Sequence, residues 1–330
     1  MNRELELAVV RVTEMAALQS APWIGRGDKI SADDAATSAM RSTLDSLSIK
    51  GTVVIGEGEM DEAPMLYIGE KVGNWHGVEV DVAVDPLEGT SLVANGLSNA
   101  LSVIAIAPKG NLLHAPDMYM EKLAVGPALA GKLSLLDPVE VTLAKAAETL
   151  GKKISDLSVM VLDRERHQTL IDTLRKCGVR INLLPDGDVA GAMAPAFPET
   201  GIDLYLGSGG APEGVLAAAA LKALGGEFQG RLMPDGQVQY ERCISMGLAD
   251  PNQVLLMKDL VGNDDVIFAA TGITNGDFLG GVRRLAHQRA ETHSMVLRAK
   301  TGTMRFIRTV HHPAEQAGRD GELFDRAMVI

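Results

Sequence analysis

Short apolar segments that end in glycine or acidic residues recur along this 330-residue chain and limit the folds that it can adopt. Runs of this length that are rich in Val and Ile are typical of buried strands. Helical spacing of apolar residues marks 4–20 and 31–47, and helical stretches separate several of the apolar runs. This pattern predicts an α/β protein whose polar loops past the strand ends bind a ligand. The six segments are TVVIGEGE (52–59), VDVAVDPLEG (80–89), VMVLDRERH (159–167), INLLPDGD (181–188), IDLYLGSGGAPEG (202–214) and VIFAATGITNGD (266–277).

The order of the segments predicts a mixed sheet. Residues 98–107 alternate and follow the segment at 80–89 directly, so not every connection is a strand–helix unit. The runs 294–299 and 303–310 flank Lys300-Thr301-Gly302 and predict a hairpin. A helical stretch at 138–155 is the predicted boundary between two parts, 1–150 and 151–330, and the polar tail from His312 to Ile330 is expected to be weakly ordered.

Composition excludes several classes of protein. Hydrophobic residues make up 46% of the chain, which supports a large core, and a net charge of −12 disfavours nonspecific binding to nucleic acid or anionic membranes. Cys177 and Cys243 are too few for a disulfide framework or a zinc cluster and suit a reducing compartment. The chain shows neither a signal peptide nor an apolar run of about 20 residues, so we expect a cytoplasmic protein that acts on a small molecule.

The loop at the end of the segment 80–89 carries the clearest chemistry. Asp85 and Glu88 are two hard oxygen ligands three residues apart, and Pro86 between them should end the strand. Gly89 allows close approach of a ligand, and Thr90 adds a hydroxyl. Mg²⁺ or Mn²⁺ bound to a phosphate needs such groups. Taken alone, such a loop is more simply explained as a solvated acidic turn, and the other motifs of the chain argue against that explanation.

Three other loops add acidic and basic candidates, each with a plainer alternative. Glu57 lies between glycines past a strand and is a better ligand candidate than Glu59, although the loop could be a solvated acidic one. Glu213 lies at the start of an Ala-rich helix, where the helix dipole favours a carboxylate in any case. Lys29 could neutralise phosphate and Asp33 could bind metal, or both could be ordinary surface charges of the helix predicted there. Ser31 is the predicted N-cap of that helix.

Possible substrate contacts follow two further strands. Arg164 and Arg166 are suited to binding a second phosphate, because one guanidinium group can donate two hydrogen bonds to phosphate oxygens. A solvated helix start is an equally good explanation of the two arginines. Asp186 and Asp188 could accept hydrogen bonds from sugar hydroxyls or simply form a turn. Tyr119 could donate to phosphate, although a core tyrosine is more usual.

Standard nucleotide and zinc motifs do not fit. Pro212 stands where the third glycine of a dinucleotide-binding loop should fall, and the chain has no GxxxxGK[ST] loop. Seven scattered histidines form neither HExxH nor HxH, which argues against zinc.

The ordered set of motifs resembles the class II fructose-1,6-bisphosphatases of bacteria, within the wider lithium-sensitive, metal-dependent phosphatase superfamily. The superfamily signature is Asp-Pro-x-(Asp/Glu)-Gly-Thr, here Asp85 to Thr90. The narrower family adds VIGEGE with DEAPMLYIGE (54–70), APDMYMEKL (115–123), PDGDV (185–189), GGAPEG (209–214) and ATGITNGD (270–277).

The resemblance implies a sugar-phosphatase fold of layered helices and mixed sheets, with the active site between an N-terminal metal and phosphate lobe (1–150) and a C-terminal substrate lobe (151–330). It implies hydrolysis of the 1-phosphate of fructose 1,6-bisphosphate in gluconeogenesis, with Mn²⁺ or Mg²⁺ as cofactor, by a homo-oligomer. The implied metal ligands are Asp33, Glu57, Asp85, Glu88 and Glu213. The implied catalytic residues are Lys29, Asp33, Glu57 and Thr90. The implied substrate contacts are Glu88, Gly89, Thr90, Tyr119, Arg164, Arg166, Asp186, Asp188 and Gly210.

Other functions remain as alternatives. The enzyme could act on sedoheptulose 1,7-bisphosphate or an inositol phosphate, since paired arginines do not fix the length of the sugar. A nucleotide-binding oxidoreductase is disfavoured by the failed dinucleotide motif. A silent regulator that binds metal or sugar phosphate is disfavoured by the complete set of acids with Thr90.

Overall fold

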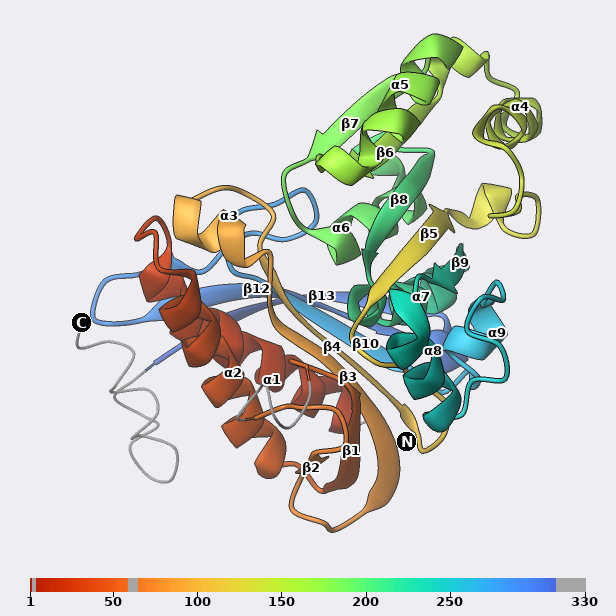
Figure 1. The fold of residues 1–330 in the computed structure, drawn as a ribbon. Helices are drawn as coiled ribbons and strands as arrows, with labels where there is room; N and C mark the ends of the chain where they lie inside the picture. Colours follow the sequence, from red (N-terminus) through yellow and green to blue (C-terminus); the bar gives the residue numbers. More distant parts are fainter. Residues whose placement is uncertain (2–3, 59–64, 313–330) are drawn as a thin grey trace.

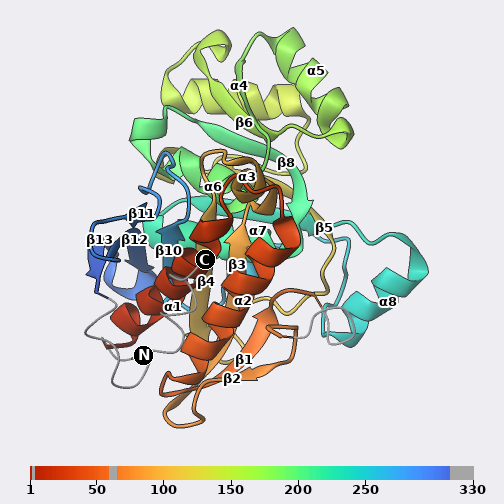
Figure 2. The same ribbon diagram turned by 90° about the vertical axis from the view of Figure 1, so that its left-hand side faces the viewer.

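Helices and sheets alternate in layers in the computed structural model, which describes residues 1, 4–58 and 65–312 (Figure 1). Helices α1 and α2 cover one face of a larger sheet, and α7 covers the other face. Beyond α7, a smaller sheet is covered by α4 and α5 on its outer face. In Figure 2 the smaller sheet with α4 and α5 stands above the larger sheet with α1 and α2. The predicted mixed α/β architecture is confirmed.

The larger sheet has strand order β11-β12-β10-β4-β3-β1-β2, and β13 pairs with β12. Only β1 and β3 run parallel, and the other pairs are antiparallel. The strands are β1 (Ile49–Ile55), β2 (Lys71–Val72), β3 (Val78–Glu88), β4 (Leu101–Pro108), β10 (Ile267–Gly272), β11 (Arg283–Arg284), β12 (Ala290–Arg298) and β13 (Thr303–His311).

The smaller sheet has strand order β7-β6-β8-β5-β9. Strand β6 runs parallel to both of its neighbours, whereas β5 is antiparallel to β8 and β9. The strands are β5 (Tyr119–Val125), β6 (Ser158–Leu162), β7 (Arg180–Leu184), β8 (Leu204–Gly210) and β9 (Glu227–Leu232).

The α-helices of the described residues follow in chain order. They are α1 (Glu4–Ser20), α2 (Lys29–Asp45), α3 (Thr90–Asn95), α4 (Val139–Leu150), α5 (Gln168–Cys177), α6 (Asp188–Met193), α7 (Ala211–Leu224), α8 (Gly236–Ser245) and α9 (Met257–Leu260). Among the residues described, no helix has the length and apolar character needed to cross a bilayer.

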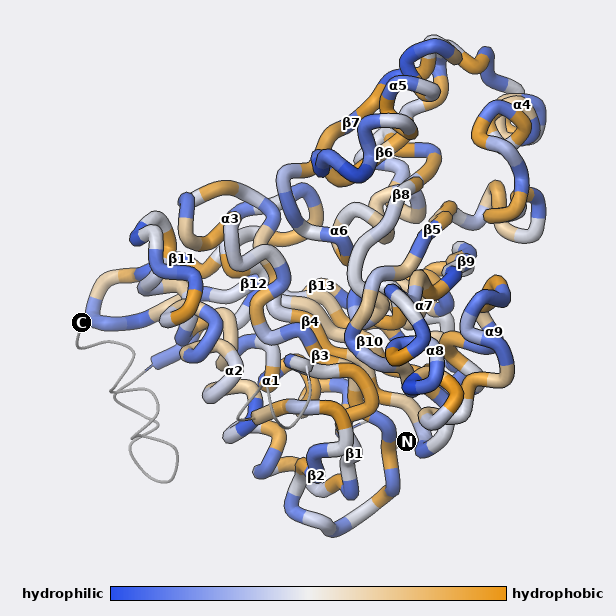
Figure 3. Tube along the Cα trace, in the orientation of Figure 1, coloured by the Kyte–Doolittle hydropathy of each residue, from blue (hydrophilic) through white to orange (hydrophobic). Residues whose placement is uncertain are grey.

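Strand alternation explains the layers. Val82 and Val84 of β3 pack toward α1 and α2, while Ala83 packs toward α7, because successive side chains of a strand point to opposite faces. Helix α7 is buried almost all round, since its alanines lie between the two sheets. In Figure 3, hydrophobic and hydrophilic residues alternate along α4 and α5, as expected for helices with one buried face.

Two local expectations were wrong. Helix α2 begins at Lys29 with Asp28 as its N-cap, because the Asp28 carboxylate accepts from Ser31 N at 3.0 Å, so Ser31 is not the cap. Strand β3 does not stop at Pro86 but resumes pairing at Glu88, opposite Leu101. A bulge tolerates the proline, since the bulged residues leave the hydrogen-bond ladder.

Three further expectations concern the C-terminal hairpin, the division of the chain into two parts, and the tail. The terminal hairpin is confirmed as β12 and β13, with Arg298 opposite Thr303. The division near residue 150 does not coincide with the division between sheets, since β5 belongs to the smaller sheet and β10 to β13 belong to the larger. The assignment of metal and sugar binding to separate lobes stays a prediction. The predicted weakly ordered tail lies outside the described residues, apart from His312.

Candidate active site

An acidic cleft of about 310 Å³ lies where β1, β3, α2, α3 and α7 meet. It brings together all five predicted metal ligands, together with Thr90 and Asp186. Among the described residues that line it, none is basic. The lining residues are Asp33, Gly56, Glu57, Gly58, Val84, Asp85, Leu87, Glu88, Gly89, Thr90, Asp117, Asp186, Pro212 and Glu213.

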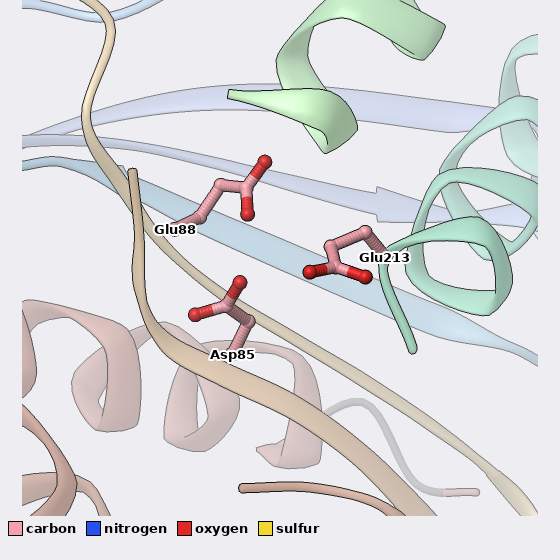
Figure 4. A group of neighbouring side chains, drawn as sticks. All are labelled: Asp85, Glu88 and Glu213. Atoms are coloured by element: carbon pink, nitrogen blue, oxygen red, sulfur yellow. The ribbon is translucent and has the colours of Figure 1, made fainter. Parts of the chain in front are cut away.

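Three carboxylates form the centre of this cleft: Asp85, Glu88 and Glu213 (Figure 4). Each offers one oxygen, and these three oxygens lie within 4.8 Å of one another. The first two come from β3, and Glu213 comes from the first turn of α7. A single cation could therefore contact carboxylate oxygens from two separate elements, and carboxylate oxygens are suitable ligands for hard divalent cations.

The bulge in β3 explains why Asp85 and Glu88 converge. Residues three apart on a regular strand point to opposite faces. Here Asp85 pairs with Val103 and Glu88 pairs with Leu101, so three steps along β3 match two along β4. The extra residue turns both carboxylates toward the same space. Backbone groups then hold them: Asp85 Oδ1 accepts from Leu87 N at 3.1 Å, and Glu88 Oε1 accepts from Val189 N at 2.7 Å.

Gly210 makes room for the third carboxylate. A Cβ at this position would lie 2.1 Å from Glu213 Oε2. That oxygen is buried and has no hydrogen-bond partner within the part of the chain that the structure describes. A buried carboxylate oxygen without a partner is costly. A bound cation would satisfy it, so the residues present fit a hard divalent metal.

Asp33 and Glu57 extend the cluster from the other side of the cleft. Burial and then the neighbouring Asp34 raise the pKa of Asp33 to about 6. Burial, followed by repulsion from Asp33, Glu213 and Asp117, raises the pKa of Glu57 to about 8. Both shifts arise first from burial and then from repulsion between neighbouring carboxylates.

The central carboxylates show the same effect. Burial raises the pKa of Asp85 and of Glu88 well above their usual ranges, and repulsion between the two adds to the shift in Glu88. Burial also raises the pKa of Glu213 to about 7, although the ammonium of Lys122 opposes the shift. Divalent cations would reverse this penalty, because they stabilise the ionised carboxylates.

Of the predicted catalytic residues Thr90 and Lys29, Thr90 lines the acidic cleft, whereas Lys29 is not among the described residues that line it. Thr90 begins α3 directly after Gly89, whose φ of 87° would strain any other residue. Lys29 is the exposed first residue of α2, and Asp33 lies four residues further along the helix. The two positions therefore lie on the same face of the helix.

Arg164 and Asp186 form a linked pair at the cleft. Arg164 Nη2 donates to Asp186 Oδ1 at 3.1 Å, and Ser91 Oγ donates to Asp186 Oδ2. Asp186 itself lines the cleft. The structure thus connects the predicted phosphate-binding arginine to α3 through one carboxylate.

Arg166 and Tyr119 form a second pair, apart from the acidic cleft. The Arg166 guanidinium carbon lies 4.7 Å from the centroid of the Tyr119 ring, and Tyr119 is 54% exposed. Arg166 Nη2 also donates to Ser208 O at 2.8 Å. Arg166 lines a neighbouring pocket of about 250 Å³, and neither Arg166 nor Tyr119 is among the described residues that line the acidic cleft.

Asp188 is the predicted sugar contact that the structure places least favourably. It is 7% exposed, and its two carboxylate oxygens accept from Lys122 Nζ and from the Tyr205 hydroxyl. A contact with a ring hydroxyl stays a prediction, and it would require Asp188 to exchange one of these buried partners.

Sequence reasoning missed two groups at this site. Asp117 lines the cleft just before β5, and its position in the motif APDMYMEKL was the available signal. Lys122 belongs to the same motif, but nothing in its local sequence indicated that it is buried. Glu59, the weaker acidic candidate, lies outside the described residues.

Comparison with known proteins shows the family to which this chain belongs. The family model described as bacterial fructose-1,6-bisphosphatase, glpX-encoded, matches residues 3–311. The fructose-1,6-bisphosphatase class 2 of Haemophilus influenzae is 47% identical, over 94% of this chain and 97% of that protein. The fructose-1,6-bisphosphatase 1 class 2 of Escherichia coli K12 is 46% identical, over 94% of this chain and 96% of that protein. This chain therefore belongs to the family of bacterial class 2 fructose-1,6-bisphosphatases.

Proposed function

We propose that this chain hydrolyses the 1-phosphate of fructose 1,6-bisphosphate to fructose 6-phosphate and phosphate in the acidic cleft. The observation that supports this most is the convergence of Asp85, Glu88 and Glu213 within 4.8 Å, with one oxygen of Glu213 buried and unpartnered in the described chain. A cleft this acidic would repel a sugar bisphosphate unless cations were bound in it.

Divalent cations are the cofactors that the donor set suits. All five proposed ligands, Asp33, Glu57, Asp85, Glu88 and Glu213, are hard carboxylates, which favour Mg²⁺ or Mn²⁺ over softer metals. When bound, such cations would neutralise charge on the transferring phosphoryl group and lower the pKa of the attacking water.

The chain's own residues would orient and deprotonate that water. Thr90 lines the acidic cleft, and its hydroxyl would hold the water in line with the phosphorus. A carboxylate oxygen of Asp33 or Glu57 would accept its proton. Lys29 would add positive charge near the phosphate, and the backbone at Gly89 leaves space for its oxygens.

The other end of the substrate would be held away from the acids. Arg164, Arg166 and Tyr119 would bind the 6-phosphate. Asp186 and Asp188 would accept hydrogen bonds from sugar hydroxyls. Glu88 and Gly210 complete the proposed substrate contacts. Gly210 also leaves room for the Glu213 carboxylate, because it has no Cβ.

Substitutions on β3 and beside β1 test the site. Glu57→Ala and Asp85→Ala should each abolish turnover while the far-UV circular dichroism spectrum stays unchanged. Glu79→Ala is the matched control, since this acid is exposed on the same strand as Asp85 and pairs with Lys109. Turnover that survives in both active-site variants would refute the assignment.

A phosphatase of sedoheptulose 1,7-bisphosphate or of an inositol phosphate is the second candidate. The two arginines proposed for the second phosphate, Arg164 and Arg166, favour a bisphosphate over a monophosphate. Turnover of a panel of phosphate esters would rank the three substrates. We also infer a cytoplasmic homo-oligomer. Inhibition by Li⁺ would support the wider superfamily placement, which rests on the loop from Asp85 to Thr90.

A further inference from the structure

Lys122 is a buried charge that the proposed chemistry does not use. It lies in the middle of β5, between β8 and β9, and is only 1% exposed. Lysine is almost never buried this completely unless its ammonium is paired. Here Nζ contacts Asp188 Oδ2, so the two opposite charges are buried together.

Tyr205 completes the pair. Its ring belongs to β8, is 0% exposed, and its hydroxyl donates to Asp188 Oδ1. Asp188 is the first residue of α6, which follows Gly187. Three elements, β5, β8 and α6, are thereby tied together through one carboxylate, and a buried network of this kind is stable only when every member is satisfied.

The glycines around this network are fitted to it. A Cβ at Gly209 would lie 1.8 Å from Asp188 Oδ2 and 3.1 Å from Lys122 Nζ, so no larger residue fits there. A Cβ at Gly214 would lie 3.4 Å from Lys122 Cε. The lysine stem therefore lies against the residue that directly follows the metal-ligand candidate Glu213.

The network also reaches the second ligand on β3. Val189 follows Asp188 on α6, and its N–H donates to Glu88 Oε1 at 2.7 Å. The position of that N–H depends on where Asp188 fixes the start of α6. This hydrogen bond restrains the Glu88 carboxylate, one oxygen of which lies within 4.8 Å of oxygens of Asp85 and Glu213.

We propose that Lys122 and Tyr205 are positioning residues for the metal cluster: they fix Asp188 and the start of α6, and so orient Glu88, while Lys122 packs beside Glu213. The inference rests on the proposed metal-dependent function. Residues that contact and orient the ligands of a metal, without contacting the metal itself, typically contribute about 10- to 100-fold to metal affinity or activity.

Tyr205→Phe is the sharpest test, because it removes a single hydroxyl and keeps the buried ring. We expect its dissociation constant for Mn²⁺, measured from free Mn²⁺ by electron paramagnetic resonance without substrate, to rise about 10-fold or more. Tyr240→Phe makes the same chemical change on α8, away from the cleft, and should leave Mn²⁺ affinity at the wild-type value.

Two further variants separate positioning from stability. Lys122→Met with Asp188→Asn removes both buried charges together, so neither is left unpaired, and should also weaken Mn²⁺ binding. Leu143→Ala opens the core between α4 and the smaller sheet; it should lower the melting temperature without changing Mn²⁺ affinity.

The outcomes are distinguishable. Weaker Mn²⁺ binding in folded Tyr205→Phe, with normal binding in Leu143→Ala, supports the inference. A Tyr205→Phe protein that loses only thermal stability and binds Mn²⁺ normally refutes it while leaving the proposed function intact. Wild-type protein that binds no Mn²⁺ or Mg²⁺ refutes the proposed metal site itself and the inference with it.

Discussion

Replacing Gly210 by alanine would move a proposed metal ligand without changing any charge. The new Cβ would lie 2.1 Å from Glu213 Oε2, and real Cβ contacts essentially never fall below 3.0 Å. The carboxylate must therefore move by at least about 0.9 Å, the difference between these two distances. Gly210 has φ −64° and ψ 143°, which alanine adopts easily, so the fold should survive.

The size of the effect follows from how narrowly metal ligands are placed. Ligand distances are held to roughly 0.2 Å, and a misplacement of about 1 Å costs roughly 100-fold in rate. We therefore expect kcat/KM for phosphate release from fructose 1,6-bisphosphate to fall about 100-fold, or about 2.7 kcal/mol of transition-state stabilisation. The dissociation constant for Mn²⁺ should rise in the same variant.

Gly262→Ala is the control for this experiment. Its Cβ would meet Asn111 Oδ1 at 3.3 Å, a mild contact far from the lining of the cleft, and the backbone there has no positive φ. This variant should keep wild-type activity. Wild-type kcat/KM and Mn²⁺ affinity in Gly210→Ala would show that the position of Glu213 does not matter, and would refute the reasoning.

Three further predictions follow from the same structure. The folded-state pKa values of Glu57 and Glu213 are raised to about 8 and about 7, so the metal-free protein loses stability as pH rises through that range, whereas cations bind the deprotonated acids. Mn²⁺ should therefore raise the melting temperature more at pH 8 than at pH 6, and an equal rise at both pH values would contradict this reasoning. Arg298→Met leaves the buried carboxylates of Glu6 and Asp265 with fewer partners and should lower the free energy of unfolding in urea by about 3 kcal/mol. A decrease below about 1 kcal/mol would show that the remaining cations are enough to stabilise both carboxylates. Thr90→Ala should lower kcat about 100-fold with KM little changed; a raised KM with intact kcat would instead assign Thr90 to binding.

Much of this arrangement was predictable from local sequence. The strands β1, β3, β4, β6, β7, β8 and β10 and the final hairpin each carry their own apolar pattern, and loops past strand ends gather at one place in such folds. The acids in the loop after β1 and at the end of β3 could therefore be expected to meet. Each acidic loop taken alone also suited a solvated turn or an ordinary helix start, so the prediction of a metal site depended on the ordered set of motifs and the family that it resembles.

What local patterns did not show depends on pairing between distant segments. The bulge that aligns Asp85 with Glu88 exists only against β4, so the sequence suggested that Pro86 ends the strand. The burial of Lys122 depends on Asp188, 66 residues further along the chain. The cap of α2 was misplaced by three residues because both Asp28 and Ser31 are good N-cap residues, and only the backbone decides between them.

The most direct test of the account is phosphate release from fructose 1,6-bisphosphate by the purified protein with Mn²⁺, with Mg²⁺, and with excess EDTA. The account predicts release with at least one of the two cations, loss of release in EDTA, and no release by Asp85→Ala under any of these conditions. Release that persists in EDTA, or that survives in Asp85→Ala, would contradict the claim that the carboxylate cleft performs metal-dependent phosphate hydrolysis.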